Sequence, residues 1–259
     1  MDFTRLPDPK APLSPAAKPK FAKDGHLDTV TLLTELAGHD SKRAKAYGMQ
    51  SQMPDYLLWT YSAGTPYWAW LGDWVPEAKL LSEFLHSFHG GGSKAVKMRR
   101  AFLATEIGTL VNTNAPSWQV GFLCHALGDA FAHIRLVNGD IAAYGYPEGH
   151  GLSFHDPDSI PKHPERYLSY CTTLFRALGG SPTSAPFRAF HDGLIELLDE
   201  LTVGYASNGM KERAVRDYLK SLTKIRITED DLKKVSKTLA FEEVITFLSS
   251  MQAKADASN

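Results

Sequence analysis

Three residues able to bind a metal ion recur at regular intervals in the segment GFLCHALGDAFAHIRL. His125, Asp129 and His133 are each four residues apart. If the segment is a helix, they span only about 80° of its circumference and share one face. The segment is otherwise rich in Phe, Leu and Ala, so we expect this face to be buried. Ionisable groups on a buried face are costly unless something pairs with them, and a metal ion would do so.

The spacing along this helix indicates more than one ion. At a rise of about 1.5 Å per residue, His125 and His133 would lie about 12 Å apart along the axis. Metal–nitrogen bonds are only about 2 Å long, so two neighbouring positions can share an ion but all three would strain to do so. We therefore predict two ions, with Asp129 between them and able to bridge through its two carboxylate oxygens.

Further candidate ligands lie on both sides of this segment, upstream in DGHLD, MPD and HSFHGGG and downstream in GHGLSFHDPD. The glycines of the last segment would let a loop fold tightly around an ion. Histidine and carboxylate ligands without thiolates suit zinc, and less selectively manganese, iron or nickel. A single buried histidine is more often a hydrogen-bonded core residue, and Asp55 after Pro54 also fits a turn or helix cap. The candidates are His26, Asp55, His86 or His89, His150, and one of His155, Asp156 and Asp158.

The hydrophobic pattern around these residues is helical almost throughout. We expect an all-α fold, a single multi-helix domain over residues 24–253, after a flexible segment rich in Pro and Lys at 1–23. Loops are expected at 59–74 and over most of 138–164, and 223–228 is the only weak strand candidate. Helices are expected at 28–38, 41–49, 76–88, 93–110, 117–137, 164–178, 185–205, 211–222, 229–239 and 241–253.

Composition excludes several classes of protein. The 28 Lys and Arg residues nearly balance the 29 Asp and Glu residues, which argues against an electrostatic nucleic-acid binder. A nuclease stays open, because a metal site supplies its own positive charge. Two cysteines, Cys124 and Cys171, give neither a disulfide framework nor a CxxC knuckle. The sequence shows no transmembrane run and no secretory signal, which predicts a cytoplasmic protein or one exported by a signal-independent route.

The order of the candidate ligands resembles that of the zinc-dependent phospholipase C and P1 nuclease group, over residues 24–160. Enzymes of this group carry HxxxD on a long helix, as in HALGD here. HALGDAFAH followed by GHG and HxPD also resembles an uncharacterised bacterial family related to the group. The resemblance implies a phospholipase C/P1 nuclease-like fold, three zinc ions and cleavage of phosphodiester bonds.

The same resemblance implies how the ligands are shared among the ions. The first ion would be held by Asp55, His86, His125 and Asp129. The second would be held by His133 and His150 with His155 or Asp158, and the third by His26 with Asp129. The sequence departs from the group at residue 154, a Phe where an acid is expected, and His26 lies well inside the chain rather than at a mature N-terminal Trp.

Together these patterns predict a zinc-dependent phosphoester hydrolase, phospholipase C-like, acting on a small-molecule or lipid phosphoester. Asp55 would serve as a ligand or as the base for the attacking water. Two alternatives are a non-catalytic, metal-stabilised helical binding protein and an exported antibacterial effector of the same hydrolase class. The aromatic segment at 56–74 would line a substrate cleft or meet lipid, although core packing is the favoured interpretation. Arg135 would reach a phosphate or lie solvated on the surface.

Overall fold

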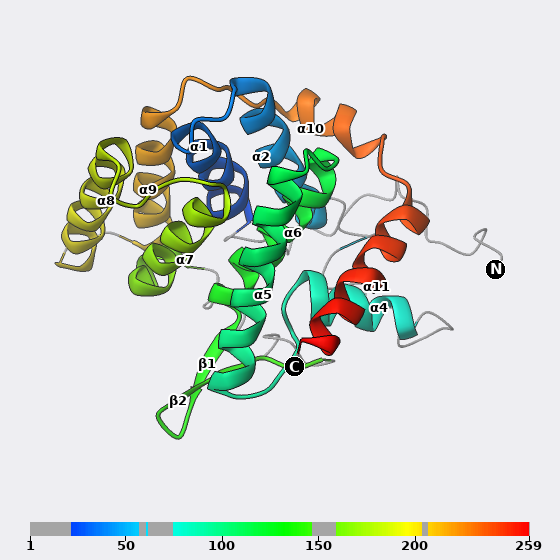
Figure 1. Ribbon diagram of the computed structural model, residues 1–259. Helices are drawn as coiled ribbons and strands as arrows, with labels where there is room; N and C mark the ends of the chain where they lie inside the picture. The colour runs from blue at the N-terminus through cyan, green and yellow to red at the C-terminus, as the bar shows by residue number, and fades with distance from the viewer. Residues whose placement is uncertain (1–21, 57–60, 62–74, 147–158, 204–206, 259) are drawn as a thin grey trace.

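A single helix, α6 (Ser117–Ala132), runs through the middle of the protein, and other helices pack around it (Figure 1). The computed structural model describes residues 22–56, 61, 75–146, 159–203 and 207–258. Every α6 residue from Val120 to Ala132 is buried, which confirms that the face carrying His125 and Asp129 is buried. The predominantly helical fold is also confirmed. The predicted flexible segment at 1–23 and the aromatic segment at 56–74 lie almost wholly outside the described residues, apart from 22, 23, 56 and 61.

The elements that precede α6 supply its closest neighbours. α2 and α5 make extensive contacts with α6, and the π-helical turns η2 and η3 also touch it. Gly121 permits a close crossing of α6 and α2, because a Cβ there would lie 2.8 Å from the backbone nitrogen of Ser51. These elements are η2 (Ala22–Asp28), α1 (Thr29–Leu36), α2 (Ser41–Tyr56), α4 (Val75–Leu80), η3 (Leu81–Leu85) and α5 (Ser93–Asn112).

The elements that follow α6 enclose it from two sides. α7 packs on α6 and on α8, α9 packs on α8, and α10 lies over α2, while α11 covers α4 and η3. Each carries an apolar stripe at helical spacing, as in Phe187, Phe190, Leu194 and Leu198 of α8, and these stripes extend one core. The elements are η5 (Ile160–Lys162), α7 (Pro164–Ala177), α8 (Ala185–Val203), α9 (Asn208–Leu222), α10 (Glu229–Ser236) and α11 (Phe241–Ala257).

The helix predicted at 117–137 is too long. It ends at Ala132, and a hairpin of two short strands follows, β1 (Ile134–Val137) and β2 (Asp140–Ala143). The strands pair antiparallel from Ile134 opposite Ala143 to Val137 opposite Asp140. Asn138 and Gly139 form the turn with φ of 53° and 87°, as a two-residue turn of this twist requires. Asn-Gly is the strongest local signal for a hairpin. The prediction of a helix as far as residue 137 did not take this signal into account.

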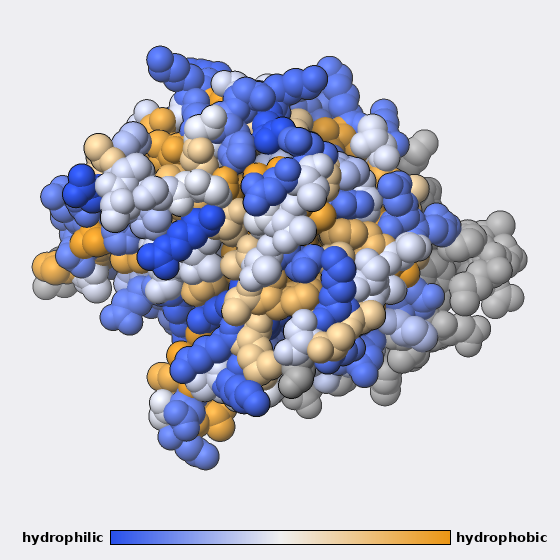
Figure 2. All heavy atoms as spheres, in the orientation of Figure 1, coloured by the Kyte–Doolittle hydropathy of each residue, from blue (hydrophilic) through white to orange (hydrophobic). Residues whose placement is uncertain are grey.

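Other boundaries also differ from the prediction. α2 continues to Tyr56 rather than ending at Met49, with Pro54 inside it, so that Asp55 belongs to its last turn. The helix predicted at 76–88 divides into α4 and η3 and ends before His86. The segment 223–228 is not a strand. Within the described ranges, no helix combines the length and apolarity needed to cross a membrane. Figure 2 shows a face on which hydrophilic and hydrophobic residues are interspersed.

Candidate metal centre

Six ionisable side chains from separate parts of the chain converge on the middle of α6. η2 provides one, the last turn of α2 provides another, and a third follows η3 directly. α6 provides two, and the last is the residue that ends it. Asp129 is the common partner of the four histidines. The six are His26, Asp55, His86, His125, Asp129 and His133.

Three atoms of this cluster form a compact triangle. The Oδ2 atom of Asp129 lies 3.0 Å from Nδ1 of His86 and 3.3 Å from Nε2 of His125. The two nitrogens are 3.2 Å apart. In a tetrahedral zinc site with bonds of about 2.0–2.1 Å, neighbouring ligand atoms are about 3.3 Å apart. The triangle therefore has the dimensions of one face of a zinc coordination tetrahedron.

Backbone carbonyls determine which ring nitrogens face the triangle. Nε2 of His86 donates to the carbonyl oxygen of Tyr61 at 2.7 Å, and Nδ1 of His125 donates to that of Ser51 at 3.0 Å. In a neutral imidazole the opposite nitrogen then carries a lone pair and no proton. If both rings are neutral, two nitrogen lone pairs and a carboxylate oxygen face one another, and either a proton on one nitrogen or a metal ion between them relieves the repulsion. Donation of the outer N–H to a carbonyl is also the usual arrangement of metal-binding histidines.

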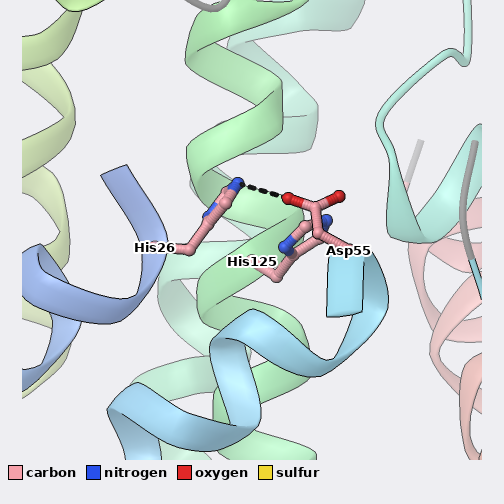
Figure 3. Close-up of side chains that lie close together, drawn as sticks. All are labelled: His26, Asp55 and His125. Carbon is pink, nitrogen blue, oxygen red and sulfur yellow. Dashed lines mark ion pairs between the residues drawn. The ribbon is translucent and has the colours of Figure 1, made fainter. Parts of the chain in front are cut away.

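The second oxygen of Asp129 faces a different group of side chains. Oδ1 lies 3.2 Å from Nε2 of His26, and Oδ2 of Asp55 lies 3.9 Å from the same nitrogen (Figure 3). His26, Asp55 and His125 each offer a ligand atom within 4.8 Å of the others. Nε2 of His125 has one lone pair and can serve one ion only, whereas Asp129 has two oxygens. The two sides of Asp129 therefore offer two adjacent positions for a cation.

Close packing of His26 against α6 depends on Gly128. A Cβ on Gly128 would lie 2.9 Å from Cε1 of His26 and 3.4 Å from Cζ of Tyr170. The His26 ring also lies against that of His125, with centroids 4.0 Å apart. Any larger residue at position 128 would thus push His26 away from Asp129.

His133, the residue that follows α6, also faces Asp129. Its backbone nitrogen donates to the carbonyl oxygen of Asp129 at 2.7 Å, as in a continuing helix, and its Nδ1 lies 3.6 Å from Oδ2 of Asp129. The same nitrogen donates to the carbonyl oxygen of His86 at 2.7 Å, and the ring stacks on Phe88. The three residues therefore share one face, as predicted, and nitrogens of His125 and His133 lie 3.3 Å and 3.6 Å from the same oxygen of Asp129. The case for more than one ion now depends on the two oxygens of Asp129.

The electrostatics of the cluster require positive charge. Burial alone would raise the pKa of Asp129, but the charged forms of His133 and His125 hold it well below its usual value. Burial and the neighbouring His26 lower the pKa of His125. Burial also opposes charge on His86, yet its hydrogen bond with Asp129 raises the pKa overall. With four neutral imidazoles, the two carboxylates leave an uncompensated charge of about −2, which protons or a divalent cation must balance.

The structure separates the remaining candidates. His86, and not His89, joins the cluster; the backbone of His89 pairs with Gly145, and burial lowers the pKa of its side chain to about 4. Arg135 is exposed and its guanidinium lies 5.3 Å from the centroid of the Tyr144 ring, as expected for a solvated surface residue. His150, His155, Asp156 and Asp158 lie outside the described residues.

Sequence reasoning missed the groups that orient the histidines. The carbonyl oxygens of Ser51 and Tyr61 leave no signal in a sequence, because every residue has one. Gly121 and Gly128 stand within the motif segment, and a glycine inside an apolar helix is a sign of close approach. Cys124 and Cys171 are free and buried, which raises the pKa of each thiol, and neither belongs to a cluster of potential ligands among the described residues.

Comparisons of the chain with protein-family models, with curated proteins and with solved structures found no match. The geometry of the cluster is therefore the basis for assigning a function.

Proposed function

We propose that this protein is a metal-dependent phosphoester hydrolase with a zinc centre built around Asp129. The observation that carries the proposal is the triangle of His86 Nδ1, His125 Nε2 and Asp129 Oδ2, with sides of 3.0, 3.2 and 3.3 Å. These are three lone-pair donors at zinc-like spacing and without sulfur. Three protein ligands with a fourth position open are typical of catalytic rather than structural zinc sites.

The chain's own residues would hold a second ion on the other side of Asp129. Oδ1 of Asp129, His26 and Asp55 are its candidate ligands, and His133, directly after α6, is a further candidate of the centre. When bound, zinc supplies a Lewis acid that acidifies water and offsets the negative charge of a phosphoryl group. For the whole centre we propose two or three zinc ions.

Asp55 is the side chain best placed to meet a substrate. Its side chain is 16% exposed, whereas those of His26 and Asp129 are 1% and 4% exposed. Water and substrate therefore approach the cluster from the Asp55 side. Asp55 acts there either as a ligand or as the base that accepts a proton from the attacking water, and the two roles differ in whether metal binding depends on it.

A second candidate function is supported by how deeply the cluster is buried. His125 is 0% and Asp129 3% exposed, which also suits a metal that only stabilises the fold of a binding protein. In that case zinc would raise the melting temperature strongly and no substrate would be turned over.

Hydrolysis of soluble phosphodiesters tests the choice between the two. We would compare the zinc-loaded and metal-stripped chain on bis(p-nitrophenyl) phosphate and p-nitrophenylphosphorylcholine. The expected result is zinc-dependent release of p-nitrophenol, lowered at least about a hundredfold by Asp55→Asn. Asp230→Asn, a change at an exposed carboxylate, is the matched control and should retain full activity.

The metal content of Asp55→Asn distinguishes the two roles of Asp55. Full zinc content with lost turnover identifies the base, and lost zinc identifies a ligand. Full zinc loading of the wild type with no turnover of either ester contradicts hydrolysis of these diesters and favours the stabilising role.

A further inference from the structure

We propose that the β1–β2 hairpin docks the protein onto an anionic lipid surface. The inference rests on the proposed function and narrows it, because it makes the phosphoester substrate a lipid of a membrane. The hairpin projects away from the helical body (Figure 1) and exposes hydrophobic residues at its surface (Figure 2). Leu136 and Val137 are 69% and 42% exposed and adjacent in the sequence.

These two side chains are not required to hold the hairpin in place. Its base is anchored elsewhere, where Ile134 and Ala143 pack with Val96 of α5 in a small separate core. β2 is also held by a bridge between Ala142 and Gly92. A singly exposed aliphatic residue is ordinary on a protein surface, but Leu136 and Val137 are neighbours at the end of a projecting strand and have cations beside them.

The charges around the hairpin identify the partner as anionic. Arg135 is exposed on β1, next to Leu136. Lys94 and Lys97 are exposed near the start of α5, which packs against β2. Asp140 is the one acidic residue of the hairpin itself. Aliphatic side chains flanked by cations fit the boundary of a bilayer. There the aliphatic side chains contact the acyl chains, and the cations are attracted to the lipid phosphates.

A second copy of the chain fits this surface less well. Residues 89–92 already pair with the outer edge of β2, through the bridges His89–Gly145 and Gly92–Ala142. β1 offers an edge of only four residues that carries Arg135, and short, charged edges resist pairing with another strand.

The hairpin is directly connected to the metal cluster. β1 begins one residue after His133, and the backbone nitrogen of Tyr144, after β2, donates to the carbonyl oxygen of His133 at 3.1 Å. At about 3.3 Å per strand residue, Val137 lies roughly 13 Å from His133. A hairpin seated in a membrane would therefore hold the cluster at a fixed, short distance from lipid headgroups.

Co-sedimentation with vesicles tests this inference. The full chain would be mixed with vesicles of phosphatidylcholine alone or with one quarter phosphatidylserine. We expect binding to the anionic vesicles, weakened more than about tenfold by Leu136→Ser with Val137→Ser. Val203→Ser with Met210→Ser, at aliphatic residues that are 86% and 64% exposed, is the matched control and should bind as the wild type does. Lys94→Gln with Lys97→Gln should weaken binding several-fold and reduce its salt dependence.

Three results would overturn the inference: no binding of the wild type, equal loss in the control variant, or equal binding to neutral vesicles. A concentration-dependent dimer that the hairpin variant loses would assign the surface to self-association instead. Vesicle binding requires no turnover, and hydrolysis of the soluble nitrophenyl esters requires no membrane. Failure of the docking inference is thus distinguishable from failure of the proposed hydrolase activity.

Discussion

Two aspartates in different regions of the molecule keep their charge in different ways. Asp231, at the start of α10, accepts a hydrogen bond from the backbone nitrogen of Thr228 and pairs with Lys45, which lower its pKa to about 2. Asp129, inside α6, is buried, and its ion pairs among the described residues are all with histidines. The charge of the capping carboxylate is balanced by a lysine and backbone groups, whereas the charge of Asp129 is balanced by histidines that carry protons or, in the proposed centre, bind a metal ion.

The same difference separates the surrounding regions. Along α10 and α11, the charged residues in ion pairs are at least partly exposed and have Lys or acidic partners, as in Lys254 with Glu106. Around α6, four histidines and a carboxylate occupy positions that the hydrophobic pattern would give to apolar side chains. The C-terminal helices therefore stabilise the fold by ordinary apolar packing. In the centre of the molecule, buried histidines and Asp129 replace part of that apolar packing.

The largest expected effect is on metal affinity. Asp129→Asn removes the charge that both cation positions share, so zinc affinity should fall by more than about a hundredfold. Asp231→Asn should leave zinc affinity unchanged and only lower the melting temperature slightly through the lost cap. Competition with a fluorescent zinc chelator measures both. Equal affinities in the two variants would remove the distinction between these carboxylates.

A smaller effect is expected from Gly128→Ala. The added Cβ would meet Cε1 of His26 at 2.9 Å, so His26 should move and the ion on its side of Asp129 should bind about tenfold more weakly. Gly209→Ala, where nothing lies within 4 Å of the new Cβ, is the control. Calorimetric titration with zinc should show one weakened and one unchanged binding step, and two unchanged steps would argue against His26 as a ligand.

A third prediction concerns the pH dependence of the metal-free protein. Burial lowers the pKa of His89 to about 4 from an ordinary 6.5, so folding favours its neutral form. This contribution to stability is complete above pH 6.5 and is lost as the pH falls toward 4. His89→Gln should remove part of that acid destabilisation, on the order of 1–2 kcal/mol. Urea unfolding at pH 7.5 and pH 4.5 measures it, and an unchanged pH dependence in the variant would contradict the assignment.

The smallest effect is expected from Tyr170→Phe. The hydroxyl of Tyr170 is buried and makes no hydrogen bond with the residues that the structure describes, so its removal leaves none of them without a partner. The melting temperature should be unchanged or slightly higher. A loss of zinc affinity in this variant would show instead that the hydroxyl supports the ligands beside Gly128.

The sequence was sufficient to predict the helical fold and the shared face of His125, Asp129 and His133, whereas His26, Asp55 and His86 were assigned to the same centre only by the resemblance, with His89 as the alternative to His86. Residue types on a helical face carry that information, since polar groups at 125 and 129 interrupt an otherwise apolar helix. The end of α6 at Ala132 was not predicted, because the helical period takes no account of the Asn138–Gly139 turn that joins β1 to β2. The carbonyl of Ser51 reaches His125 because α2 crosses α6 closely, and the carbonyl of Tyr61 reaches His86 from beyond α2. Both contacts are properties of packing and not of local sequence.

The most direct test of the metal centre is the zinc content and coordination of the purified protein. Elemental mass spectrometry and X-ray absorption spectroscopy would be applied to tag-free protein dialysed against zinc. We predict at least one tightly bound equivalent, two if both sides of Asp129 are filled, with nitrogen and oxygen ligands at about 2.0–2.1 Å and no sulfur. Absence of tightly bound zinc, or a zinc–sulfur distance near 2.3 Å, would contradict the assignment of His86, His125 and Asp129 as its ligands.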